Sequence, residues 1–363
     1  MARKICFLTP HVYPHYRGGA EVQVSHLCKE MLDRGWEVIH IAESNKPFSE
    51  SSDPRLKVLF LPKAKRNRKF LQYRRLKTII ETEKPEVIYV RPVLQYLFVA
   101  ALVAKGTECK VVWACSSDSK LKRSYFLKGL SPLGILNYIL FKKALKMVDH
   151  LIVQTSYQHD LLLKNYSAES VVIANGHPKP MEKLSDQRSP RIIWIGRSAH
   201  VKNPLAFLEL AESLSDSKYE FVMIMAKLDA ELIGQIIERA SRIANLKLLT
   251  DISNQEVHSA LSDSALLVNT SHSEGFSNTF IEAWMRGVPV LSLNADPEKL
   301  LSSQVGGFLC ADLSGMKQRI EALLSDQKAW TSSSESCREY ALRELSIQNA
   351  VNRLEAVIDN QDL

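Results

Sequence analysis

Residues 265–293 read ALLVNTSHSEGFSNTFIEAWMRGVPVLSL, and this stretch by itself indicates an α/β fold. Residues 265–269 are an apolar run of strand length, residues 279–286 are helical in character, and residues 288–293 are a second apolar run. A polar loop separates the first strand from the helix. A strand, a helix and a second strand in this order predict a parallel sheet that helices cover on both faces.

The same alternation extends along the chain in both directions. It predicts further strands at residues 4–9, 36–42, 56–61, 86–90, 110–115, 150–154, 191–196, 219–225 and 246–249. A helix over 20–34 follows the first of them and ends at Gly35, a residue suited to the position after a helix. The stretch NGHPKPMEKLSDQRSP (175–190) is the natural linker. We therefore predict two doubly wound Rossmann-like domains, 1–174 and 191–345, facing each other across a cleft that receives their strand-end loops.

Length and composition agree with this division. The chain has 363 residues, about two domains' worth, with 45% apolar and 24% charged residues, which argues against disorder, collagen and coiled coil. No uninterrupted apolar run reaches the roughly 18 residues of a membrane span, and the apolar start of the chain is too brief for a signal peptide. The six cysteines form no CxxC pair and no Cys/His cluster. We expect a cytoplasmic protein with reduced thiols.

The net charge of +7 is unevenly distributed. Residues 1–175 hold 28 Lys+Arg against 15 Asp+Glu, a net +13, whereas residues 176–363 hold 19 against 25, a net −6. The basic half therefore favours a membrane surface, an acidic acceptor or nucleic acid as its partner. No recognisable nucleic-acid-binding motif accompanies the charge, so we expect no nucleic acid.

A basic stretch with interleaved aromatic residues, LPKAKRNRKFLQYRRLK (61–77), concentrates this charge. Its cations are Lys63, Lys65, Arg66, Arg68, Lys69, Arg74, Arg75 and Lys77. A patch on the cytoplasmic face of an anionic membrane is one interpretation, and an acceptor with phosphate or carboxylate groups is a second. A merely solvated surface is the third. Residues 120–128 and 142–146 add further cations in the same half.

Two strand-to-helix loops have the composition of phosphate sites. Gly18 and Gly19 precede the first predicted helix, where a close backbone approach and helix N–H groups suit a phosphate. Arg197 and Lys202 flank the loop after the strand at 191–196, and they offer a planar fork and a point charge to phosphate oxygens. Each loop taken alone is weak evidence, because a tight turn or a solvated charged loop has the same composition.

The segment HSEGFSNTFIE (272–282) is the strongest signal. Glu274 lies in the loop and Glu282 eight positions later on the helix. The backbone of residues 275–278 (Gly275, Phe276, Ser277 and Asn278) brings N–H groups to the start of the helix, again a cradle for phosphate. A carboxylate grips two vicinal hydroxyls, so two of them around such a cradle predict a sugar nucleotide as the ligand.

Four motifs together resemble the retaining glycosyltransferases of family 4. They are GGAE at 18–21, NG at 175–176, GRxxxxK at 196–202 and EGFxNxxxEAxxxGVPV at 274–290. The resemblance implies the GT-B architecture, a nucleotide diphosphate sugar as donor, and a glycan or lipid-linked glycan as acceptor, as in polysaccharide or lipopolysaccharide biosynthesis. It also implies that a final helix, about 346–363, crosses back to the N-terminal, acceptor-side domain.

The resemblance also implies roles for single residues. Arg197 and Lys202 would hold the donor pyrophosphate, Glu282 the ribose hydroxyls, and Glu274 the donor sugar or reacting centre. Gly18 and Gly19 would close on the distal phosphate. We expect a UDP- or GDP-sugar as substrate, and neither a cofactor nor a metal, since the chain has no Asp-x-Asp pair.

Two departures from the family pattern concern the sugar. The usual His after the strand at 110–115 is replaced by Cys115-Ser116-Ser117-Asp118, which makes Asp118 the candidate for contacting sugar hydroxyls or the reacting centre. The usual glycine turn after the strand at 219–225 is replaced by Ala226-Lys227. Two alternatives therefore stay open, a nucleotide-sugar epimerase and a non-catalytic binding protein. A dehydrogenase is disfavoured because no GxGxxG follows the first strand.

Overall fold

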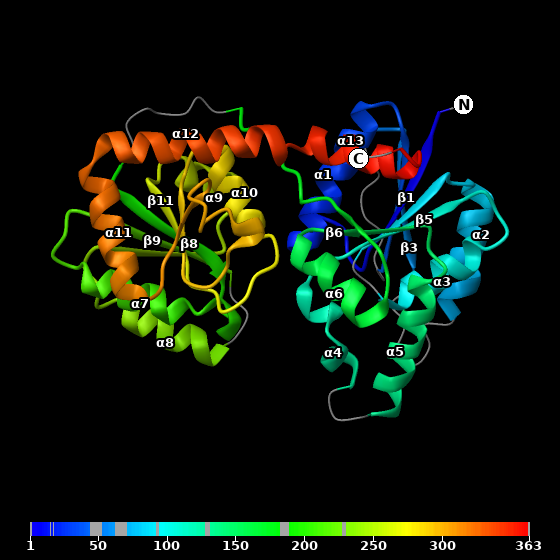
Figure 1. The fold of residues 1–363 in the computed structure, drawn as a ribbon, viewed down its shortest axis with the longest axis horizontal. Helices are drawn as coiled ribbons and strands as arrows, with labels where there is room; N and C mark the ends of the chain where they lie inside the picture. The colour runs from blue at the N-terminus through cyan, green and yellow to red at the C-terminus, as the bar shows by residue number, and fades with distance from the viewer. Residues whose placement is uncertain are drawn as a thin grey trace. The chain divides into compact units, whose positions relative to one another are not determined.

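The computed structural model divides the chain into two compact units. The first unit comprises residues 1–178 and 347–363, and the second comprises residues 179–346. The residues described are 2–14, 16, 18–43, 53–61, 71–91, 94–127, 131–181, 189–226 and 230–361. Figure 1 shows that each unit has a twisted sheet with helices on both faces.

The first unit is built on a parallel sheet of seven strands in the order β3-β2-β1-β4-β5-β6-β7. The strands are β1 (Lys4–Leu8), β2 (Glu37–Glu43), β3 (Leu56–Leu61), β4 (Val87–Val90), β5 (Lys110–Ala114), β6 (His150–Val153) and β7 (Val171–Val172). The order reverses between β1 and β4, whose backbones pair from Ile5–Val87 to Leu8–Val90. Loops after β1 and β4 therefore open apart at this switch point and leave a crevice where ligands bind in doubly wound sheets.

Helices cover the two faces of this sheet with separate apolar clusters. One cluster joins the sheet to α2 (Leu71–Glu83), α3 (Leu94–Ala104), α4 (Arg123–Leu127), α5 (Pro132–Leu145) and α6 (Ser156–Tyr166). The other joins it to α1 (Gly19–Asp33) and α13 (Ile347–Ile358). Continuous burial of strands such as β4 follows from cover on both faces.

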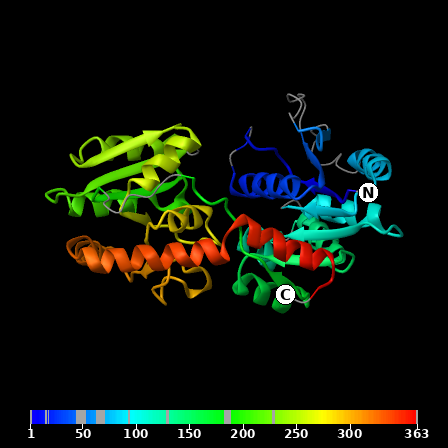
Figure 2. The same ribbon diagram turned by 90° about the horizontal axis from the view of Figure 1, so that it is seen from above.

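The terminal helix α13 belongs to the first unit, as predicted. It buries six apolar residues against α1 and the sheet, namely Ile347, Ala350, Val351, Leu354, Val357 and Ile358. Glu355 accepts hydrogen bonds from Arg34 Nη1 at 2.6 Å and Trp36 Nε1 at 2.9 Å. Figure 2 shows α13, drawn in red, beside α1.

The second unit has a parallel sheet of six strands in the order β10-β9-β8-β11-β12-β13. The strands are β8 (Arg191–Arg197), β9 (Glu220–Ala226), β10 (Leu246–Thr250), β11 (Leu266–Asn269), β12 (Val290–Ser292) and β13 (Gly307–Leu309). Its helices are α7 (Pro204–Ser213), α8 (Ala230–Ala240), α9 (Asn254–Ser262), α10 (Asn278–Met285), α11 (Leu313–Ser325) and α12 (Gln327–Glu344). The switch point here lies between β8 and β11, which carry the two predicted donor loops.

These elements confirm the predicted fold class, two doubly wound domains of GT-B type. Each predicted strand is present, with ends within about two residues of the prediction. Two short strands, β7 and β13, were not predicted. A strand of two or three residues is too short to produce an apolar period that a sequence reveals.

Candidate functional site

The predicted donor residues of the second unit gather at the carboxyl edge of its sheet. Arg197 is the last residue of β8, and Lys202 ends the short 3₁₀ helix His200–Lys202 that follows. Glu274 lies in the loop after the neighbouring strand β11, and this loop leads into α10. The Arg197 side chain is exposed and has no ion-pair partner among the described residues. Loops after β8 and β11 thus meet at the switch point.

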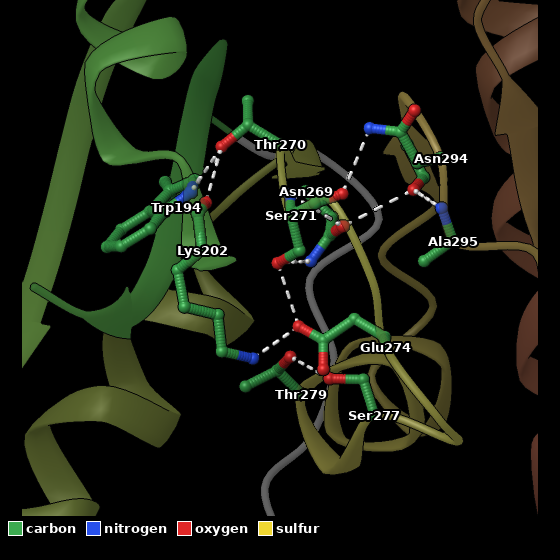
Figure 3. A network of polar contacts seen from close by, with 11 residues as sticks. Trp194, Lys202, Asn269, Thr270, Ser271, Glu274, Ser277, Thr279, Asn294 and Ala295 are labelled. Atoms are coloured by element: carbon green, nitrogen blue, oxygen red, sulfur yellow. Dashed lines mark hydrogen bonds and ion pairs between the residues drawn. The ribbon is translucent and has the colours of Figure 1, made fainter. Parts of the chain in front are cut away.

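Lys202 and Glu274 form an ion pair across these two loops (Figure 3). The Lys202 ammonium donates to Glu274 Oε1, and both side chains are largely buried, with 21% and 12% of their surface exposed. Ser271 Oγ donates to the same carboxylate oxygen at 2.8 Å. Two residues with separate predicted roles are therefore joined, and Glu274 is fixed in place by a cation and a hydroxyl.

A chain of polar side chains supports the loop that carries Glu274 (Figure 3). Asn269 donates to Ser271 Oγ at 3.1 Å and accepts from Ser292 Oγ at 3.3 Å. Asn294 Nδ2 donates to the Ser271 carbonyl at 3.1 Å. Asn269 and Ser292 end β11 and β12, so side chains at the ends of two adjacent strands support the Glu274 loop.

Thr270 fastens the β8 loop to the β11 loop. Its hydroxyl donates to the carbonyls of Lys202 at 3.1 Å and Asn203 at 2.8 Å, and it accepts from Trp194 Nε1 at 3.0 Å. Trp194 is buried, and a Cβ on Gly196 would lie 2.5 Å from its ring. Gly196 is therefore required by the approach of the indole.

Helix α10 begins directly after the Glu-Gly-Phe turn. Ser277 is its N-cap residue, and its hydroxyl pairs with Thr279 Oγ1 at 2.9 Å without capping a backbone amide. The Phe276 ring is buried against Trp284 with 6.2 Å between ring centroids, so only the backbone of Phe276 can meet a ligand. The observed helix, 278–285, is displaced by one residue from the predicted 279–286.

Glu282 lies half-buried in the second turn of α10. Burial raises the pKa of its carboxyl from 4.5 to about 7, and the charge of Arg286 opposes this rise. A carboxyl with such a pKa changes its ionisation close to neutral pH. Glu274 lies in the loop before α10, and Glu282 lies eight residues later on the helix itself.

In the first unit, the Gly18–Gly19 pair begins helix α1, as predicted. Gly18 is the N-cap residue, and a Cβ placed on it would lie 2.3 Å from Glu21 Oε2. Glu21 is buried, and burial raises the pKa of its carboxyl, while the charges of His11, Arg91 and Lys120 lower it. The predicted phosphate cradle is thus faced by a carboxylate of its own helix.

Asp118 lies at the same edge of the first sheet and is held by a buried amide. It begins a 3₁₀ helix after β5 and accepts from Gln158 Nε2 at 2.7 Å. Gln158 accepts from the Gln154 backbone, and Gln154 Nε2 shares the Asn175 side-chain oxygen with Arg91 Nη2, at 3.0 and 2.8 Å. Strand-end residues after β4, β5, β6 and β7 thus form one network.

Cys115 is the first residue of the stretch 115–118, which follows β5 where the family resemblance leads us to expect a histidine. Its thiol is buried, donates to the Ser117 carbonyl at 3.5 Å, and burial raises its pKa to about 11. The thiol therefore stays protonated at neutral pH and offers no base in place of the imidazole.

Part of the basic stretch 61–77 is described. Arg74, Arg75 and Lys77 are exposed on α2, and Lys77 pairs with Glu81 at 3.6 Å. Lys63, Lys65, Arg66, Arg68 and Lys69 lie outside the described residues, as does Lys227. Within the described ranges, no cluster of three or more His, Cys, Asp or Glu side chains is arranged to hold a metal ion. In the same ranges, no helix has the length and apolar character to cross a membrane.

Two family models match consecutive parts of the chain. The model of Glycosyltransferase Family 4 matches residues 17–178, and the model of Glycosyl transferases group 1 matches residues 189–326. Together they include the switch point of the second unit and the candidate site residues Gly18, Gly19, Asp118, Arg197, Lys202, Glu274 and Glu282. The chain belongs to the family 4 glycosyltransferases.

Individual relatives of this family 4 glycosyltransferase are distant. A 2-deoxystreptamine N-acetyl-D-glucosaminyltransferase of Niallia circulans is 29% identical over 105 residues, which is 28% of this chain and 27% of that relative. Anabaena HepE, solved with UDP-glucose, superposes with a TM-score of 0.76 at 14% identity over 98% of this chain and 99% of that chain. WaaG, a glycosyltransferase of lipopolysaccharide biosynthesis, superposes with a TM-score of 0.73 at 14% identity over 97% of this chain and 99% of that chain. At such identities the structures establish the fold alone.

Sequence reasoning missed the residues that hold this glycosyltransferase's site in place. Asn269 ends the apolar strand β11, and Thr270 and Ser271 directly follow it. Arg91 and Gln154 directly follow β4 and β6. A polar residue at the carboxyl end of a buried strand is a signal that the sequence does contain. Their partners, however, come from distant segments and became visible only with the strand order.

Proposed function

We propose that this enzyme transfers a sugar, with retention of anomeric configuration, from a nucleotide diphosphate sugar to a glycan or lipid-linked glycan. The observation that carries the proposal is the meeting of Arg197, the Lys202–Glu274 pair and the start of α10 at the switch point between β8 and β11. Cations, a helix N-terminus and a fixed carboxylate at one strand edge suit a diphosphate joined to a polyhydroxylated ring.

In this proposal, Arg197 and Lys202 bind the donor diphosphate. Arg197 is exposed and presents a planar fork, whereas Lys202 lies deeper and shares its charge with Glu274. As the sugar departs, negative charge grows on the leaving diphosphate, and two preplaced cations stabilise it. We therefore propose that catalysis needs neither a cofactor nor a bound metal.

Glu282 and Glu274 bind different parts of the donor in this proposal. Glu282, on the second turn of α10, accepts hydrogen bonds from the ribose hydroxyls. Glu274 contacts the donor sugar, and its ion pair with Lys202 links sugar position to diphosphate position. A carboxylate that is already fixed by Ser271 and Lys202 loses little conformational entropy when it binds a hydroxyl.

Asp118 is the residue of the first unit that we place near the reacting centre. Its carboxylate is oriented by Gln158 at the carboxyl edge of the first sheet and would contact sugar hydroxyls near the reacting centre. The neutral Cys115 thiol offers no base. We therefore propose that the departing phosphate itself accepts the acceptor's proton.

The comparisons support a UDP-sugar as the first donor to test, with a GDP-sugar second. HepE was solved with UDP-glucose, and the Niallia circulans relative is a transferase of an N-acetylglucosaminyl group. WaaG's role in lipopolysaccharide biosynthesis supports a lipid-linked glycan, reached from the cytoplasmic side of a membrane, as the acceptor.

The test is thermal unfolding with and without UDP, GDP, ADP and their sugar conjugates, in buffer containing EDTA. A ligand at 100 times its Kd adds about 2.7 kcal/mol to the free energy of unfolding. That raises the Tm of a unit of this size by roughly 5–10 °C. We expect one nucleotide series to give this rise, and Arg197→Ala and Glu282→Ala to abolish most of it.

Matched variants separate the site from general surface effects. Arg242→Ala and Glu335→Ala each remove an exposed charge of the second unit outside the site, and both should keep the full rise. If folded protein shows no rise with any nucleotide at millimolar concentration, the donor site is wrong. A rise that appears only with added divalent metal contradicts the metal-free part of the proposal.

A further inference from the structure

The outward face of helix α5 in the first unit is apolar. The inward face contributes Phe141, Ala144 and Leu145 to the core, as expected for a helix that covers a sheet. The outward side chains Ile135, Leu136 and Ile139 are nevertheless 39%, 50% and 45% exposed. A surface helix normally presents polar side chains to water, so this face has the composition of a surface that another apolar phase covers.

Lysines continue the same face toward the end of the helix. Lys142 and Lys143 lie seven residues after Ile135 and Leu136, and seven residues is close to two helical turns. Lys146, the C-cap residue, follows Lys142 by one more turn, and all three lysines are exposed. The outward face therefore runs from aliphatic to cationic along one stripe.

Neighbouring elements extend this surface. Helix α4 packs beside α5 (Figure 1) and adds exposed Tyr125, with Lys122 and Arg123 also exposed at its start. We call these residues with the α5 stripe the α4–α5 surface: Lys122, Arg123, Tyr125, Ile135, Leu136, Ile139, Lys142, Lys143 and Lys146. It is distinct from the basic stretch 61–77, whose described cations lie on α2.

The charge of this segment has a single sign. Residues 119–148 contain seven Lys or Arg and no Asp or Glu. The acidic residues on either side are engaged inside the unit. Asp118 accepts from Gln158 Nε2, and Asp149 accepts from the Val111 backbone N–H, both at 2.7 Å. The cations of the α4–α5 surface are therefore not neutralised by the adjacent sequence.

We propose that the α4–α5 surface docks on an anionic lipid membrane. The aliphatic side chains of α5 enter the interface, while the lysines contact lipid phosphates, since long cationic side chains keep their charge at headgroup level. Arg123 donates to the Asn165 carbonyl and adds positive charge beside them. A second copy of the chain fits less well, because two such surfaces would bring like charges together. This inference rests on the proposed function in one respect: a lipid-linked acceptor would give the enzyme a reason to lie at a membrane. Docking itself does not require a bound donor.

The test is cosedimentation of the full chain with vesicles of phosphatidylcholine alone or with phosphatidylglycerol. Each cation near an anionic surface strengthens binding about fivefold at low salt. We expect binding to the anionic vesicles that weakens at least tenfold between about 0.1 M and about 0.5 M salt. Leu136→Glu with Ile139→Glu, and separately Lys142→Glu with Lys143→Glu, should each lower it at least tenfold.

Control variants in the second unit each carry one substitution of the same kind. Ile237→Glu replaces a 47% exposed isoleucine of α8, Lys247→Glu replaces an exposed lysine of β10, and both should bind within twofold of wild type. Trp113 of the first unit contacts Phe141 of α5, so an unchanged midpoint of urea denaturation, followed by Trp113 fluorescence with the other tryptophans replaced by Phe, shows that the α5 variants are folded. This control needs no nucleotide and keeps the test separate from the donor site. If the wild-type protein does not cosediment with anionic vesicles, the proposal is wrong. It is also wrong if both α5 double variants bind these vesicles as strongly as the wild type. Dimerisation in solution that Leu136→Glu abolishes would assign the face to a second copy.

Discussion

Glu282 is the residue whose ionisation we expect to set the pH dependence of donor binding. Burial raises its pKa to about 7, and only the carboxylate form offers both oxygens as charged acceptors to two hydroxyls. The Kd for a nucleotide diphosphate sugar should therefore rise as the pH falls below about 7, approaching tenfold per pH unit. Glu282→Gln should bind about 10–100 times more weakly at pH 8 and show no such change. Calorimetric titration between about pH 5.5 and 8.5 measures both.

A sugar-linked diphosphate is the right probe, because its phosphates are diesters that stay ionised over this range. Without ligand, Glu282 affects stability in the opposite direction: a rise in pH strengthens donor binding but lowers the free energy of unfolding. The folded state holds the extra proton between the ordinary pKa of 4.5 and the raised value of about 7, so the free energy of unfolding falls as the pH rises through this interval. Glu335→Gln, at an exposed position of α12, should alter neither profile. A wild-type Kd that is flat from pH 5.5 to 8.5 contradicts the assignment.

Single residues also show where sequence reasoning stops. Arg197, Lys202 and Glu274 were predicted in or beside strand-to-helix loops, and the structure has them there. Glu282 was predicted on the helix that follows, and it lies on α10. The Lys202–Glu274 pair was not predicted, because it joins residues 72 positions apart in the chain. Which loops meet depends on β11 lying beside β8, and the apolar pattern of a strand does not specify its neighbour.

At the scale of the element, we expect the packing of helix α13 to contribute strongly to the free energy of unfolding of the first unit. Leu354 is 2% exposed among residues of α1 and the first sheet. Truncation leaves a cavity as well as lost burial, so Leu354→Ala should lower the free energy of unfolding of the first unit by about 2–5 kcal/mol. Urea denaturation followed by fluorescence of Trp36 and Trp113, with the other tryptophans replaced by Phe, measures this change.

Asn352→Ala is the control for that experiment, because Asn352 is exposed on the same helix. It should alter the free energy of unfolding by no more than about 0.5 kcal/mol. Equal effects of the two variants would mean that α13 does not pack as described.

The elements themselves were largely predictable. Strands buried on both faces appear as unbroken apolar runs, as VIYV in β4 does, so their positions follow from the sequence. The helix pattern of α13 was equally visible, with apolar residues at 347, 350, 351, 354, 357 and 358. Its destination, the first unit, followed from the family resemblance and not from the pattern, since an amphipathic helix fits any apolar face of the right width.

At the scale of the whole molecule, the two units have separate cores. The apolar clusters of the first unit contain residues from both ends of the chain, and the cluster of the second unit contains residues 192–330 alone. The eight donor-site residues predicted in the second half all lie in the second unit: Arg197, Lys202, Glu274, Gly275, Phe276, Ser277, Asn278 and Glu282. Stability and donor binding should therefore respond to different parts of the chain.

Hydrogen exchange of the full chain, resolved by peptide, tests this separation. Leu354→Ala should speed exchange roughly 30-fold or more in α1, α13 and the first sheet, because those amides exchange through opening of the first unit. Strands β8–β12 should change less than twofold, since no cluster of the described residues joins the two cores. A nucleotide sugar should instead protect residues 196–203 and 269–282, where the loops after β8 and β11 meet. Equal acceleration of both units by Leu354→Ala would show that they unfold as one cooperative body, and donor binding would then stabilise the first sheet as strongly as the second.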